Sequence, residues 1–396
     1  IKEEQYQEFF SHIGAGFGKP LLTMHNNTEG TISYTNLICI PSTRPFDLFN
    51  PDRKSSLKLY INRVFITDKC DALIPSYLRF IKGLVDTQDI DLNVSREMLQ
   101  NNPAVAKISK SLVGKILREL KKVSEKNADG YKSFWKEYGA VLKEGLYEDA
   151  ERKEALLDLC RFSTNENDDP ISLSEYVEKM PEKQKDIYYI SAETKDQALA
   201  SPHLEGFKSK KIPVLIMTDA IDQFWLPMVG SYKEKKFTSI TQGQINLDDL
   251  DEKNKDKKKD DKNEKEKKDK EYVDLVAQLK VVLGDQVKDI RLSSKLTDSP
   301  VCLVADEGDM DIAMEQLMAQ RDTNYKGAPR ILEINGDHSL IKNMKSLLSK
   351  KENNDLVSDA GTLLFEQARL MEGKMPADPA QFSKIMNQFL LKAIPN

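Results

Sequence analysis

The sequence is poor in the residues that build metal and redox sites. It holds four cysteines and four histidines among 396 residues. The cysteines lie far apart, and no Cys-x-x-Cys or His-Glu-x-x-His pattern occurs, so we expect no metal site. Widely spaced thiols, most of them in apolar or helical settings, are expected to be buried and free, as in a reducing compartment: Cys39, Cys70, Cys160 and Cys302.

Long hydrophobic runs and an excess charge of one sign are also missing. No segment approaches the roughly 18 apolar residues of a membrane span. The chain has 59 basic and 64 acidic residues, a formal net charge of −5, which argues against general nucleic-acid binding because that needs a basic face. No pair of nucleophile and base can be nominated, so a stand-alone hydrolase is disfavoured.

Composition and periodicity predict a multidomain chain of mixed α/β and α+β class. A length of 396 residues favours two to four domains. We expect five consecutive parts: a large α/β unit at 1–130, a helical connector at 131–166, a small α/β unit at 167–247, a charged linker at 248–271 and an α+β domain at 272–396. The linker contains 10 Lys and 11 Asp or Glu. We expect it to be mobile or partly helical, with a fully solvated single helix as the alternative.

Hydrophobic patterning predicts the main elements of these parts. A turn is expected at 25–30, and strands are expected at 32–40, 57–66, 186–190, 213–217 and 236–240, the last three parallel. Apolar residues at every third or fourth position predict a long helix from about Pro103 and further helices over 131–162. His338 is expected to cap a helix or to bond the backbone.

An arginine lies at a predicted loop-to-helix junction in the acidic run 84–100. Ser95 with Met98 and Leu99 indicates a helix start, so Arg96 and Gln100 would share one helix face. An arginine on a short, braced segment suits phosphate oxygen, because its planar fork stays charged and bonds bidentately. The alternative is that Arg96 pairs with a nearby Asp.

The run Asp91–Gln100 resembles the middle domain of the ninety-kilodalton heat-shock chaperones, and the bacterial HtpG group most closely. The resemblance continues in order through the whole chain, at Pro45–Phe49, Leu59–Ile66, Leu73–Leu78, Ser299–Val304 and Ile331–His338. It implies that 1–247 form the two α/β parts of a middle domain with their connector, and that 272–396 form a dimerisation domain.

The resemblance also implies that two domains together form the ATPase site. In that family the residues that match Arg96 and Gln100 reach the γ-phosphate of ATP, which a separate N-terminal domain holds. They thereby complete an ATPase site. We expect the chain to be the middle and C-terminal part without that domain. ATP would then be bound only in the full-length protein. Within this chain, Arg96 would contact the bound ATP, and Arg96 and Gln100 would be the catalytic residues. This chain alone would not hydrolyse ATP.

Two apolar groups are candidates for contact with unfolded client proteins. Four residues form an i, i+4, i+7, i+8 stripe on a helix expected to begin near Gly308 and Asp309: Met310, Met314, Leu317 and Met318. Core packing is the alternative, but Met suits adaptable binding surfaces. Trp225 follows Phe224, and we expect one of the two to face outward. The family resemblance implies client contact for the stripe and for Trp225, with burial of Trp225 as the alternative.

The last two predicted helices carry apolar stripes close to the chain end. They comprise Leu356, Leu363, Leu364, Phe382, Ile385, Met386, Phe389 and Leu390. Intrachain packing and a two-fold interface of four helices both account for these stripes. The resemblance implies a homodimer through them.

The resemblance implies a molecular chaperone that binds partly folded client proteins and is driven by ATP in the full-length protein. The alternative is an ATP-independent dimeric scaffold or interaction protein with the same fold. We expect no nucleic-acid or membrane partner. The ending Lys392–Asn396 carries neither an acidic co-chaperone peptide nor an ER-retention tail, so a bacterial cytoplasm is expected.

Overall fold

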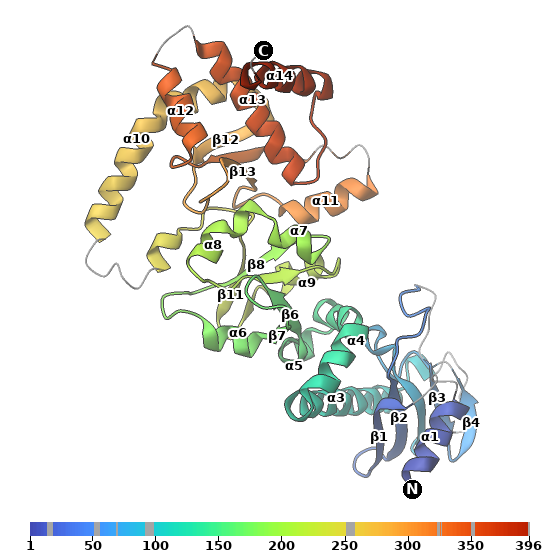
Figure 1. Cartoon of the computed structure of the whole chain (residues 1–396). Coiled ribbons are helices and arrows are strands. Elements are labelled where there is room, and N and C mark those ends of the chain that lie inside the picture. The colour runs from blue at the N-terminus through green and yellow to red at the C-terminus, as the bar shows by residue number, and fades with distance from the viewer. Residues whose placement is uncertain are drawn as a thin grey trace. The chain divides into compact units, whose positions relative to one another are not determined.

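The computed structural model describes residues 1–13, 19–50, 56–68, 70–91, 99–250, 258–322, 325, 327–349 and 353–394. The chain divides into two compact units (Figure 1). Unit 1 comprises Ile1–Arg161, Pro170–Ser174 and Phe224–Tyr232, and unit 2 comprises Phe162–Asp169, Glu175–Gln223 and Lys233–Asn396. The mixed α/β and α+β class is confirmed, while the five-part boundaries stay a prediction.

Unit 1 is built on a mixed five-stranded sheet in the order β1-β2-β5-β3-β4. Its strands are β1 (Pro20–Thr28), β2 (Tyr34–Pro41), β3 (Ser56–Ile61), β4 (Val64–Thr67) and β5 (Lys82–Thr87). Strand β5 pairs antiparallel with β2 and parallel with β3. Alternate residues of β5 are buried, because successive side chains point to opposite faces of a sheet.

Two sequence expectations in this sheet are wrong. The predicted single strand at 57–66 is a hairpin, because Asn62 and Arg63 take positive φ angles of 51° and 64° and turn the chain back on itself. The predicted turn at 25–30 is largely strand: β1 continues to Thr28, which pairs with Tyr34.

Helices complete unit 1. They are α1 (Glu3–His12), α3 (Pro103–Lys126), α4 (Ala128–Glu148) and α5 (Lys153–Leu159). Asn102 caps α3 by accepting from the backbone N–H of Ala104, and Pro103 occupies the first turn. The predicted apolar faces are confirmed as buried: Val105, Ile108, Leu112, Ile116 and Leu120 of α3, and Phe134, Tyr138, Val141 and Leu142 of α4. The Tyr138 hydroxyl donates to the Pro41 carbonyl at 2.9 Å, which ties α4 to the end of β2.

The first layer of unit 2 centres on the parallel strands β11 (Lys235–Ser239), β8 (Ile187–Ser191) and β9 (Leu215–Met217), as predicted. Strand β6 (Arg161–Thr164) pairs antiparallel with β9. The neighbouring short elements are α6 (Leu173–Lys179), α7 (Lys195–Leu199), η3 (Pro202–Leu204) and α8 (Glu205–Ser209). Strands β7 (Ile171–Ser172) and β10 (Ser231–Tyr232) and most of α9 (Asp222–Val229) belong to unit 1.

The second layer of unit 2 is a three-stranded sheet in the order β12-β14-β13, with helices packed on it. Its elements are α10 (Lys258–Leu283), β12 (Val287–Leu292), β13 (Val301–Val304), α11 (Ile312–Arg321), β14 (Arg330–Ile334), α12 (Ser339–Leu347), α13 (Asn354–Met371) and α14 (Pro379–Ala393). His338 caps α12 by accepting from the Leu340 N–H, as predicted. Of the charged run, residues from Lys258 onward are helical and continue without a break into the apolar half of α10.

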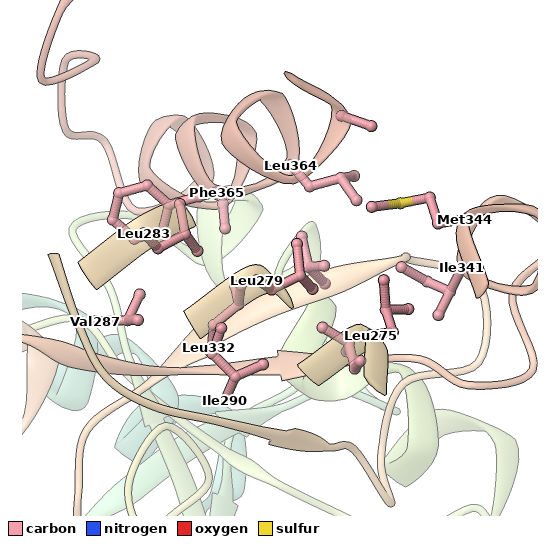
Figure 2. Packing of buried hydrophobic residues seen from close by; sticks show 14 of the residues in the cluster. Leu275, Leu279, Leu283, Val287, Ile290, Leu332, Ile341, Met344, Leu364 and Phe365 are labelled. Atoms are coloured by element: carbon pink, nitrogen blue, oxygen red, sulfur yellow. The ribbon is translucent and has the colours of Figure 1, made fainter. Parts of the chain in front are cut away.

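Helices α10, α12 and α13 enclose the main core of this layer against the sheet. Figure 2 shows Leu275, Leu279 and Leu283 of α10 facing Leu332 and Ile290 from the strands and Leu364 and Phe365 from α13. A side chain at Gly361 would overlap Leu279, so the glycine allows α10 and α13 to approach closely. The four cysteines are buried and free, as predicted.

The two layers of unit 2 are joined by directional polar contacts. The Glu205 carboxylate accepts from the backbone N–H groups of Thr297, Asp298 and Ser299 at 2.8 to 3.1 Å. Burial alone would raise the pKa of Glu205, but these bonds and the Ser299 hydroxyl hold it below its ordinary value. Lys295, which is fully buried, donates to the Ile240 carbonyl at 2.8 Å.

Candidate functional site

The predicted phosphate-contacting pair is only partly described. Arg96 lies outside the described residues. Gln100 has an exposed side chain next to the buried Leu99, two residues before the cap of α3. It lines a surface hollow together with Ala72, Ala106, Ser109, Lys110, Glu151 and Arg152.

Both cations beside Gln100 already have acidic partners. Lys110 forms an ion pair with Glu151, and this pair lowers the pKa of the Glu151 carboxyl. Arg152 binds Asp149 at 2.8 Å. The hollow therefore carries balanced charge, and the described residues give no separate phosphate site at this position.

Trp225 is the buried member of the Phe224–Trp225 pair, which contradicts the client contact that the resemblance implies and agrees with the stated alternative. Its side chain is 0% exposed, among the largest fully buried side chains of the described residues. Phe224 is half-buried instead, with its ring edge-on to Tyr147 at 6.4 Å between centroids, and Met228 is exposed. Adjacent side chains on a helix point about 100° apart, so one of the pair faces the interior, and here it is the tryptophan.

Helix α11 carries the predicted methionine stripe on a face that the chain buries only in part. Met314, Leu317 and Met318 are half-buried, and Met310 is 40% exposed. The helix begins at Ile312, later than predicted, because Asp311 is the residue that caps it by accepting from the Ala313 N–H at 2.9 Å. Met310 therefore precedes the helix. None of the four residues is fully buried, and client contact and core packing both stay predictions for this stripe.

Polar side chains attach α11 to the rest of unit 2. Asp311 accepts from the Ser239 hydroxyl at 2.5 Å and from the Thr241 hydroxyl at 3.0 Å. Gln316 donates to the Glu372 carbonyl at 2.7 Å. Glu315 forms a buried ion pair with Arg330 at the start of β14. Sequence reasoning missed this pair, and the only signal was an acid beside a run of apolar residues.

The predicted dimer residues divide into two groups. Leu364 and Ile385 are buried within the chain, and Phe389 packs against the core of the second layer, so for these three the intrachain interpretation holds. Leu356, Leu363 and Phe382 are half-buried. Met386 and Leu390 are exposed, and so are the neighbouring Leu391 and Ile394 of the described C-terminal segment. The outer half of the α14 stripe is therefore uncovered.

Comparison with known proteins gives consistent matches along the whole chain. A family model described as Hsp90 protein matches residues 1–395. The chaperone protein HtpG of Roseobacter denitrificans is 45% identical over 396 residues, which cover 100% of this chain and 63% of that protein. The HtpG chaperones of Paramagnetospirillum magneticum and Wolbachia pipientis are 45% and 42% identical, over 100% and 99% of this chain and 63% and 62% of their own lengths. The chain thus spans less than two thirds of the length of these curated relatives.

Proposed function

Because the chain belongs to the Hsp90 protein family, we propose that it works in a molecular chaperone that binds partly folded client proteins. The observation that carries the proposal is the apolar face of α11, where Met310 is exposed and Met314, Leu317 and Met318 are only half-buried. Methionine side chains are flexible and polarisable, so they pack against many different apolar partners. A partly folded protein offers such apolar segments before its own core has formed.

We propose that this protein acts as a homodimer and that its cycle is coupled to ATP. The outer half of the α14 stripe supports dimerisation, because exposed Met386 and Leu390 continue a face whose inner half is already packed. The ATP would be held by a separate nucleotide-binding domain. Gln100, whose side chain is exposed just before α3, and Arg96 would contact the γ-phosphate of this ATP.

In the described residues no helix could span a membrane.

Charge placed on the outer face of α11 tests the client-binding proposal. The variant Met314→Glu/Met318→Glu should weaken binding of fluorescein-labelled, reduced and carboxymethylated α-lactalbumin by about tenfold or more, measured by fluorescence anisotropy. The circular-dichroism melt should stay close to that of the unmodified chain, because neither methionine is in the core.

The matched control is Val273→Glu/Val281→Glu, which adds two charges at exposed apolar positions of α10. It should bind the probe as the unmodified chain does. Unchanged probe binding by the α11 variant would refute α11 as the client surface. A steep fall in its melting temperature would assign the stripe to structural packing instead.

A further inference from the structure

Helix α11 turns polar as well as apolar side chains toward the rest of unit 2, since its two buried residues are Ile312 and Glu315. A surface helix normally turns its apolar side to the core and its polar side to solvent. In α11 the side chains that contact the rest of unit 2 include Glu315 and Gln316, whereas Met314 and Leu317 face away from these contacts. At 100° per residue, the midpoint of Glu315 and Gln316 lies about 180° from the midpoint of Met314 and Leu317.

This orientation needs an attachment, because the methionine side of the helix is only half-buried and would gain from turning further inward. The helix has 10 residues, which is too short to be stable in isolation. Burying Met314, Leu317 and Met318 would gain hydrophobic energy that their present half-burial does not. The polar contacts of the opposite side must outweigh this gain.

The buried ion pair between Glu315 and Arg330 is the centre of this attachment. Both side chains are 4% exposed. Arg330 also donates to the Met310 carbonyl at 3.1 Å, and the backbone N–H of Ala328 donates to Glu315 at 2.7 Å. Arg330 belongs to the central strand of the second-layer sheet, so these bonds tie both the helix and its leading segment to that strand.

Gly327 leaves the space that the Glu315 carboxylate occupies in this attachment. Its φ of +67° favours glycine, and a Cβ there would lie 2.9 to 3.1 Å from the carboxyl group of Glu315. Any larger residue at this position would therefore displace the carboxylate that Arg330 binds.

We propose that the Glu315–Arg330 pair is a positioning element for client binding, which holds the methionine face of α11 outward. This inference rests on the proposed function, because it explains how the proposed client surface stays exposed. Neither residue touches the client. Each acts by fixing the rotation of the helix about its own axis.

Single and paired substitutions test the proposal. Glu315→Met leaves the buried Arg330 without its partner, and Arg330→Met leaves Glu315 with only the more distant Lys374, at 3.8 Å. In both variants α11 should detach, and hydrogen exchange of its amides at 312–321 should accelerate. Binding of the labelled α-lactalbumin probe should weaken by about tenfold. The double variant Glu315→Met/Arg330→Met should recover most of both losses, because apolar groups of similar volume replace buried ion pairs with little cost.

Substitutions at two separate glycines distinguish the positioning role from the effect of backbone strain. Gly327→Ala should reproduce the single ion-pair variants. Gly230→Ala is the control, because its φ of +68° imposes the same backbone strain and no atom lies within 4 Å of the added Cβ. If Glu315→Met or Arg330→Met does not fold, Gly327→Ala carries the test.

The outcomes distinguish this inference from the proposed function. Loss of probe binding in Met314→Glu/Met318→Glu with normal binding in Gly327→Ala and in the folded single variants would overturn the positioning role alone. Normal binding in all variants would overturn client binding by α11 itself. Equal losses in Gly327→Ala and Gly230→Ala would show that strain, not the ion pair, matters.

Discussion

Charging the outer face of α14 should convert a dimer into monomers. The variant Met386→Glu/Leu390→Glu changes two side chains that are 39% and 49% exposed. Full burial of a Met or Leu side chain is worth about 1.5 to 3 kcal/mol, so covering the exposed part of each gains about 1 kcal/mol. In a two-fold interface every change counts twice, which gives about 4 kcal/mol for the pair of protomers.

A loss of about 4 kcal/mol weakens dimerisation by about a thousandfold. The cost of desolvating four new carboxylates adds to this figure, so it is a lower bound. Sedimentation velocity across a concentration series through the micromolar range measures the change directly. The melting curve of the variant should match that of the unmodified chain at concentrations where both are monomeric, because Ile385, the buried residue of the helix, is unaltered.

The control Gln381→Glu/Gln388→Glu adds the same two charges to exposed positions on the other side of α14. It should dimerise as the unmodified chain does. Dimers of equal affinity in Met386→Glu/Leu390→Glu would refute the reasoning, and so would an unmodified chain that stays monomeric throughout the series.

Two further predictions concern the core and the proposed ATP coupling. Leu279→Ala removes a side chain that is buried between α10 and α13, and should lower the free energy of unfolding by about 2 to 5 kcal/mol in urea titrations; a change below about 1 kcal/mol would contradict the packing shown in Figure 2. In a fusion with the nucleotide-binding domain of an HtpG relative, Arg96→Ala and Gln100→Ala should each lower kcat for ATP far more than they weaken nucleotide affinity. Equal losses in both quantities would assign these residues to binding.

Elements with a regular period could be predicted from the sequence. The stripe of α3 repeats every three or four residues over about four turns, and each of its predicted residues is buried, because a long amphipathic helix has one stable way to face a core. The parallel strands β8, β9 and β11 could be predicted because strand-like segments alternate with helical ones, and β8 and β9 are short apolar runs.

Features set by one or two local residues were missed. The hairpin of β3 and β4 turns at Asn62 and Arg63, and the second position lacks the glycine that normally signals such a turn. The start of α11 was placed too early, because several acids precede the helix and only Asp311 caps it. Trp225 and Phe224 are neighbours in sequence, and no local pattern decides which of them is buried.

The candidate site depended on contacts that sequence does not reveal. The methionine stripe was predicted, and its exposure is compatible with the proposed role. Its attachment was not, because Glu315 and Arg330 come together only when β14 takes its place in the sheet. Buried charge pairs of this kind depend on tertiary structure, whereas periodicity reports only which side of an element is apolar.

The joint between the layers of unit 2 has a mechanical consequence. Apolar contacts have no fixed direction, so two surfaces joined by them can slide. Hydrogen bonds weaken steeply when donor and acceptor are displaced by a small distance. Three consecutive amides converge on one carboxylate at Glu205, and the buried ammonium of Lys295 donates to the Ile240 carbonyl with Glu333 at 4.0 Å. A shear between the two layers would therefore have to break these directed bonds, so we expect the layers to resist sliding past each other.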